Sequence, residues 1–194
     1  MNIKNRPSKV DDFFVRKDIL MFRKATEKDI DRISEIYEEL HDAEEAGEAS
    51  IGWVRGVYPT RATAETAVEA GDMFVEEIDG IIVAAARINR EQVAEYAYAD
   101  WNYEAPNDRV MVLHALVVSP KIKGRGYGTA FVDFYEKYAL ENGCPYLRID
   151  TNAKNTAARS LYKKLGYTEV STVPCVFNGI DGVQLVCLEK TLKQ

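Results

Sequence analysis

Three glycines, Gly124, Gly126 and Gly128, alternate along the chain between an apolar segment and a helical pattern. Glycine adopts positive φ angles and lets the backbone approach a ligand closely. Successive backbone N–H groups at the start of a helix bind anions such as phosphate, and the helix dipole assists them. Lys121, Lys123 and Arg125 add positive charge to the same segment. This spacing predicts a site for a phosphorylated ligand.

Three kinds of glycine loop compete for this segment. A P-loop needs a lysine before its Ser or Thr, and none precedes Thr129. The dinucleotide fingerprint is closer, since Asp150 could be its ribose-binding acid, but its third glycine falls one residue early, at Gly128. The remaining reading is a nest of backbone amides for a pyrophosphate. A tight turn without a ligand stays open, because short motifs match by chance.

Two further sets of residues could carry chemistry. Asn155 and Tyr162 are two helical turns apart and share one face of an expected helix. From the pattern alone, Asn155 is equally a helix-start residue and Tyr162 a core aromatic. His114 lies in a buried strand and has a pKa suited to proton transfer near neutral pH, but a one-residue change of register would turn it to the other face.

The glycine segment VVSPKIKGRGYG, residues 117–128, resembles the cofactor signature of the GNAT superfamily of N-acetyltransferases, Gln/Arg-x-x-Gly-x-Gly/Ala after a strand. Lys123 stands where the family has Gln or Arg, which keeps the positive charge but loses a planar fork of donors. Downstream, DTNAKNTAARSLYKKLGYTEV resembles the second cofactor motif of the same family. The resemblance covers about residues 21–190.

This resemblance implies a mixed α/β fold with a mostly antiparallel, V-shaped sheet and helices on both faces. It implies transfer of an acetyl group from acetyl-CoA to an amine by direct attack. Tyr162 would be the general acid. The coenzyme would contact Leu116, Val117, Val118, Lys123, Gly124, Arg125, Gly126, Tyr127, Gly128, Thr129, Asn155 and Ala158.

The general base is left open. The resemblance places His114 near the acyl group, but a buried histidine is more often a core residue with its hydrogen bonds satisfied. An ordered water or a carboxylate from the acidic segments could act instead. A GNAT domain that binds coenzyme A without catalysis is the alternative function, and a longer acyl donor is also compatible with these motifs.

Periodicity predicts the elements that position these residues. We expect residues 1–20 to form an arm or added helix and residues 21–194 to form one domain. Asp79-Gly80 predicts a hairpin turn. Helices are expected after Thr26 and over about 60–70, 127–143 and 154–166. Strands are expected over 110–118, 145–150, 167–170 and 183–189, with a polar insertion over 89–109.

Composition narrows the partners. The net charge of −6 argues against a general nucleic-acid binder, and no window is apolar enough to span a membrane. Three cysteines and the absence of a secretion signal predict a reduced, cytoplasmic protein, and no Cys/His spacing suits a metal. A homodimer is compatible with the sequence, which does not specify the oligomeric state.

The acceptor is expected to enter between two acidic, aromatic segments, residues 39–59 and 91–108. Carboxylates there would steer a cation, and aromatic rings could line an alkyl or cation-binding wall. These features predict a small cationic amine or a peptide amine, rather than an anionic acceptor. The candidate wall residues are Trp53, Tyr58, Tyr96, Tyr98 and Trp101.

Overall fold

The computed structural model describes residues 20–122 and 124–193. Residues 1–19, which make up nearly all of the predicted N-terminal extension, and Lys123 lie outside the described residues. Within the described ranges the strands are β1 (Leu20–Lys24), β2 (Met73–Ile78), β3 (Ile81–Asn89), β4 (Val110–Val118), β5 (Tyr146–Asn152), β6 (Thr168–Phe177) and β7 (Ile180–Thr191). The helices are α1 (Ile30–Glu45), α2 (Arg61–Glu69), α3 (Tyr127–Glu141) and α4 (Thr156–Lys164). Short 3-10 turns are η1 (Glu27–Asp29), η2 (Ala94–Tyr98), η3 (Asn107–Arg109) and η4 (Pro120–Ile122).

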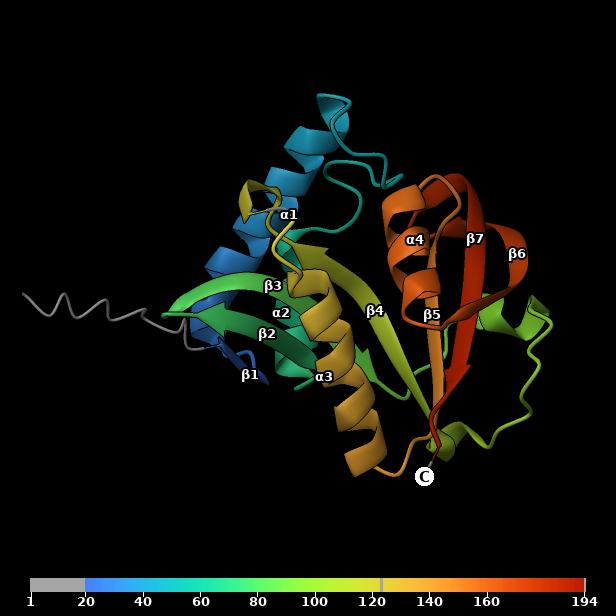
Figure 1. Ribbon diagram of the computed structural model, residues 1–194. Helices are drawn as coiled ribbons and strands as arrows, with labels where there is room; N and C mark the ends of the chain where they lie inside the picture. Colours follow the sequence, from blue (N-terminus) through green and yellow to red (C-terminus); the bar gives the residue numbers. More distant parts are fainter. Residues whose placement is uncertain (1–19, 123, 194) are drawn as a thin grey trace, which may run out of the picture.

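The described strands form one sheet in the order β1-β2-β3-β4-β5-β7-β6. Neighbouring strands are antiparallel at every pairing except β4–β5, which is parallel. Figure 1 shows β4 and β5 close together at one end and diverging toward the other, which gives the sheet its V shape. The predicted mixed, mostly antiparallel fold is therefore confirmed.

Helices cover both faces of the sheet, as expected. On one face α3 and α4 bury Phe131, Tyr135 and Tyr162 against the strands. On the other face α1 and α2 bury Ile33, Ile36 and Ala64 against β2, β3 and β4. The insertion between β3 and β4 packs over the β5–β7 half through a third cluster that includes Tyr96. No helix in the described part of the chain is long and apolar enough to cross a membrane.

The sheet contains two β-hairpins, β2–β3 and β6–β7, and only the first was predicted from the sequence. Asp79 and Gly80, with φ angles of 49° and 83°, form the predicted turn between β2 and β3. The predicted boundaries of the last two strands were wrong: β6 and β7 extend to a second turn at Asn178-Gly179, with φ angles of 51° and 77°. Proline is uncommon inside strands because it has no backbone N–H to donate. Pro174 is tolerated here because β6 is an edge strand, with no neighbouring strand on its outer side.

Candidate active site

The opening of the V is set by the length of the β4–β5 pairing. Val110 to Leu113 pair with Tyr146 to Ile149, and there the parallel ladder ends. Beyond it, β5 continues on β7 alone, from Asp150 to Asn152, while β4 continues on β3. His114 and Asp150 are thus the first residues past the point of separation, one on each arm. The β4 edge that faces the gap offers backbone groups to a peptide-like ligand.

A bulge in β4 decides which side chains face the gap. Ala115 has a φ of 50°, and the β3–β4 register shifts by one residue between the pairs Arg87–His114 and Ala85–Val117. Before the bulge, Leu113 packs on the face covered by α3 and α4; after it, Leu116 does so. The bulge therefore leaves His114 on the α1–α2 side and Leu116 on the α3–α4 side.

A cavity of about 560 Å³ lies along β4 and the glycine turn. The cofactor-binding residues predicted from the sequence line it, except Lys123, which lies outside the described residues. The loop after α1 supplies Ile51 and Trp53 to the opposite wall. The predicted residues that line the cavity are Leu116, Val117, Val118, Gly124, Arg125, Gly126, Tyr127, Gly128, Thr129, Asn155 and Ala158.

The start of α3 points backbone donors into this cavity. Gly126 is the N-cap residue and has a φ of 84°, a left-handed conformation that side chains rarely adopt. Ala130 donates the first backbone bond of the helix, to the carbonyl of Gly126 at 3.0 Å. The three preceding helical residues, Tyr127 to Thr129, have no acceptor within the helix. Their N–H groups are the donors that an anion at this position needs.

Asn155 and Tyr162 both reach the cavity from α4. Asn155 caps this helix: its Oδ1 accepts the N–H of Ala158 at 3.1 Å. The helix begins at Thr156, two residues later than expected, because the cap residue itself is outside it. Capping uses only the side-chain oxygen, so the amide nitrogen of Asn155 is left to donate to a ligand. Tyr162 is 5% exposed, and burial, with a smaller effect of Asp150, raises the pKa of its hydroxyl, so the group keeps its proton at neutral pH.

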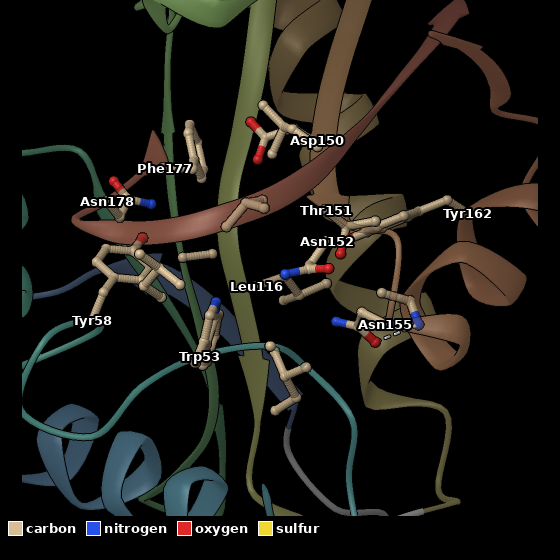
Figure 2. Close-up of a pocket in the computed structure, with 17 residues that line it drawn as sticks. Trp53, Tyr58, Leu116, Asp150, Thr151, Asn152, Asn155, Tyr162, Phe177 and Asn178 are labelled. Carbon is tan, nitrogen blue, oxygen red and sulfur yellow. Dashed lines mark hydrogen bonds between the residues drawn. The ribbon is translucent and has the colours of Figure 1, made fainter. Parts of the chain in front are cut away.

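Two more cavities continue from the first. A junction cavity shares Leu116, Asn155 and Tyr162 with it and extends to Asp150 and to the tip of the β6–β7 hairpin. Figure 2 shows Asp150, Phe177, Tyr58 and Trp53 around this junction. A third cavity, of about 370 Å³, shares Tyr58 and Asp150 with the junction and is lined by α1, α2 and β3. One cleft therefore passes through the opening of the V.

The loop between α1 and α2 closes one side of this cleft. The carboxylate of Glu44 accepts the backbone N–H groups of Ile51 and Gly52, which fixes the path of the loop. Gly52 then passes so near β5 that a Cβ atom on it would lie 2.3 Å from Nδ2 of Asn152. Only glycine allows this approach without moving Asn152. The loop places Trp53 and Tyr58 between the two larger cavities.

Asp150 is a candidate that was considered above only as a ribose-binding acid. It lines both the junction and the third cavity, and its Oδ2 accepts the hydroxyl proton of Tyr96 at 2.8 Å. Removal from water raises the pKa of Asp150 to about 6, although the Tyr96 hydroxyl bond opposes the rise. A carboxylate with a pKa near the working pH is suited to accept a proton during a reaction.

The model of the Acetyltransferase (GNAT) family matches residues 31–167, well over half of the chain. The chain belongs to this family. The match spans the splayed strands, the glycine turn, α3 and α4, which are the elements that build the cleft. The GNAT resemblance seen in the two sequence motifs is thereby confirmed.

Two curated relatives are similar to this chain over less than half of its length. An aminoglycoside N(6′)-acetyltransferase from Klebsiella aerogenes is 32% identical over 82 residues, which is 42% of this chain and 54% of the relative. An uncharacterized N-acetyltransferase from Methanocaldococcus jannaschii is 30% identical over 74 residues, which is 38% of this chain and 33% of the relative. The aligned part thus spans between a third and about half of these relatives.

Solved structures match over nearly the whole chain. A GNAT-family acetyltransferase from Streptococcus agalactiae has a TM-score of 0.73 and 25% identity, covering 90% of this chain and 96% of that one. An acetyltransferase structure from Salmonella typhimurium, solved with its cofactor acetyl-CoA, has a TM-score of 0.63 and 18% identity, covering 90% and 95%. At that identity the second likeness shows the fold alone.

His114 lies at the third cavity of the GNAT cleft in a weakly basic state. It lines the third cavity, and its Nε2 lies 3.0 Å from Oδ1 of Asn89. Removal from water and the charge of Arg87 lower the pKa of His114 to about 4. A neutral imidazole of this kind accepts a proton less readily than Asp150 does. The role of His114 as the base stays a prediction, with Asp150 as its rival.

Two of the predicted aromatic residues lie at the GNAT cleft and three do not. Trp53 and Tyr58 line it. Tyr96 is buried against Trp101 with ring centroids 5.0 Å apart, and Tyr98 is 78% exposed. The prediction that Tyr96, Tyr98 and Trp101 form an acceptor wall was therefore wrong. The insertion packs Tyr96 and Trp101 against the β5–β7 half of the sheet, which its local sequence does not reveal.

The charges of the GNAT cleft also differ from the sequence-based prediction. Lys121, which was expected to add charge at the glycines, instead forms an ion pair with Glu39 at 2.9 Å. Among the acids of α1, several are bound to Arg55 at the surface. Glu91 and Asp150 are the carboxylates that line the third cavity within the described residues. Arg87 is there too, but its guanidinium is held by Asp72 and Glu91, at 3.2 and 2.7 Å.

Proposed function

We propose that this protein is an acetyl-CoA-dependent N-acetyltransferase whose acceptor is a small primary amine that carries positive charge. The observation that carries the proposal is the continuous cleft. Its first cavity combines the glycine turn and the free β4 edge, and its third cavity opens on Asp150 from the other side. Donor and acceptor entering from opposite ends would meet at the junction.

The donor end is suited to coenzyme A. N–H groups of Tyr127 to Thr129 would bind the pyrophosphate, with Arg125 adding charge. The pantetheine arm contains amides, so the β4 edge past the bulge and the side-chain N–H₂ of Asn155 can pair with it. A backbone N–H near Leu116 would stabilise the negative charge that develops on the acetyl oxygen.

Two side chains would move protons at the junction. Asp150 would accept a proton from the bound ammonium, and the free amine would then attack the acetyl carbon. Tyr162 would donate a proton to the sulfur as the C–S bond breaks, and the second proton that the nitrogen loses would replace it. The new N–C bond and the released thiol balance the reaction. The pKa of Asp150, at about 6, suits a proton acceptor near neutral pH, and burial raises the pKa of Tyr162, so its hydroxyl is protonated before the reaction.

The acceptor end favours a cation over an anion. Asp150 and Glu91 line the third cavity, while Arg87, which also lines it, is already paired with Asp72 and Glu91. Rings of Tyr37 and Tyr58 provide apolar surface for a short alkyl segment. The aminoglycoside relative acts on a polycationic class of molecule by its name, so aminoglycosides belong in the acceptor panel.

Thiol release from acetyl-CoA tests the proposal. Polyamines, amino acids, aminoglycosides, short peptides and aminosugar phosphates are offered in parallel, and kcat/KM is compared. We expect turnover with a cationic amine and its loss in Asp150→Asn. Binding of acetyl-CoA without thiol release on any amine would favour the catalytically silent coenzyme-binding module instead, and preference for an aminosugar phosphate would refute the cationic acceptor.

A further inference from the structure

The insertion between β3 and β4 brings one hydroxyl to a carboxylate that lines the cleft. Tyr96, in the turn η2, is 4% exposed, and its hydroxyl donates to Oδ2 of Asp150 at 2.8 Å. Fifty-four positions separate the two residues, so this contact depends on the tertiary packing of the insertion. A buried hydroxyl held in this way fixes the acceptor group as well as itself.

The insertion is anchored just after Tyr96, at Trp101 and Asn102. Trp101 donates its indole N–H to the carbonyl of Tyr96 at 2.9 Å, and Arg148 from β5 lies over the indole ring at 4.0 Å. The backbone N–H of Asn102 donates to Glu189 of β7 at 2.9 Å. These contacts tie the insertion to β5, which carries Asp150, and to its neighbour β7, so Tyr96 and Asp150 keep their relative position.

The two oxygens of Asp150 are consequently unequal. Oδ2 is occupied by Tyr96, and in the part of the chain that the structure describes no group donates to Oδ1. Asp150 lines the junction and the third cavity, and Figure 2 shows its carboxylate directed into the space opposite Phe177. The free oxygen is the one that an incoming amine can use.

We propose that Tyr96 is a positioning residue for the acceptor amine, because its hydroxyl holds one oxygen of Asp150 and leaves the other to take the amine proton. The inference rests on the proposed function of Asp150. It assigns to the insertion a role in the reaction that neither glycine motif nor helix α4 can supply.

Groups from every element packed around Asp150 set its titration. The Tyr96 hydroxyl favours the ionised carboxylate, whereas Glu95 of the same turn disfavours it by charge repulsion. The remaining titratable neighbours that interact with Asp150 are Tyr58 from the loop before α2, Tyr162 from α4, Cys175 from β6 and Cys187 from β7. His114 of β4 lines the same cavity.

The test is Tyr96→Phe, which keeps the ring and removes the hydroxyl. A lost hydrogen bond to a charged group corresponds to a rise of about one to two pKa units for Asp150. The pKa is measured by ¹³C NMR of aspartate-labelled protein, with Asp150→Asn assigning the signal. In the acetyl transfer, kcat/KM at pH 7 should fall about two- to ten-fold and recover near pH 9, as expected for that shift.

Two variants control the experiment. Tyr98→Phe changes an exposed ring in the same turn and should leave both pKa and rate unchanged. Glu95→Gln removes the repelling charge and should shift the Asp150 pKa downward, the opposite direction. An unchanged Asp150 signal in Tyr96→Phe, or a uniform loss of rate without a shift of the pH profile, would overturn the proposal. Absence of turnover in the parent protein would count against the proposed function alone, because the NMR titration needs no turnover.

Discussion

At the scale of single residues, Tyr162 is the side chain that we propose as the proton donor. Tyr162→Phe keeps the packing of the ring and removes the donor, so kcat should fall roughly 10- to 1000-fold while acetyl-CoA still binds. Tyr167→Phe is the matched control, since Tyr167 packs against Tyr162 at 5.9 Å between centroids but lines none of the three cavities. Steady-state kinetics with chemistry shown to be rate-limiting measures the effect. Equal rates for Tyr162→Phe and the parent would reduce Tyr162 to a packing residue.

Glu76 is a residue whose effect falls on stability. Both carboxylate oxygens are buried without a hydrogen-bond partner among the described residues, on β2 opposite Phe22 and Ala84. Removal from water raises the pKa of Glu76 to about 8 from a usual 4.5. Because the pKa of Glu76 is higher in the folded state, the folded protein holds a proton that the unfolded chain releases. The free energy of unfolding is therefore highest below pH 4.5 and falls as the pH rises toward 8.

Glu76→Met should therefore make the protein more stable than the parent at alkaline pH. Thermal unfolding between pH 5 and 9 should show a smaller fall in Tm for the variant than for the parent, and a higher Tm at pH 9. Glu69→Met, at an exposed position at the end of α2, serves as the control. Parallel Tm–pH curves for Glu76→Met and the parent would show that Glu76 finds compensation in solution.

At the scale of elements, the start of α3 is the part that should respond to the coenzyme. A ligand at 100 times its Kd stabilises a protein by about 2.7 kcal/mol, so acetyl-CoA should raise Tm. Gly126→Asp introduces a negative charge and a side chain at a φ of 84°, and should abolish the shift. Gly126→Ala separates the two effects, because it adds strain without charge and should retain part of the shift. No Tm shift in the parent at millimolar acetyl-CoA would contradict the coenzyme assignment.

Elements that depend on local sequence were predictable, whereas the long-range contacts between elements were not. The glycine turn, α3, α4 and the Asp79-Gly80 hairpin depend on residues a few positions apart, so composition and spacing identify them. Asp150 becomes a site residue only because the β4–β5 ladder ends after Ile149 and because Tyr96 approaches from an insertion. The missed hairpin has a local signal of its own in Asn178-Gly179, a residue pair typical of two-residue turns.

At the scale of the whole molecule, the net charge of −6 gives the protein a negative field. A cationic acceptor approaching Asp150 and Glu91 should be attracted by it, and salt screens such attraction. We expect kcat/KM for a diamine to fall several-fold between low salt and 0.5 M salt, with a neutral amine of similar size changing little. Cationic turnover that is indifferent to salt would remove the steering argument while leaving the reaction itself intact.

The separation of β4 from β5 leaves the protein with a strand edge inside the sheet. Backbone amides along that edge are less protected from exchange with solvent. Amides of β4 next to the gap, from Ala115 to Val118, lack the β5 partner that Val110 to Leu113 have. In the free protein we expect the unpaired amides among them to exchange with deuterium faster than those of the paired stretch. Bound acetyl-CoA would lie along the edge as a temporary strand and slow that exchange. The pantetheine arm of the coenzyme would thus take the place that β5 has beside the paired part of β4, and it would do so only while the coenzyme is bound.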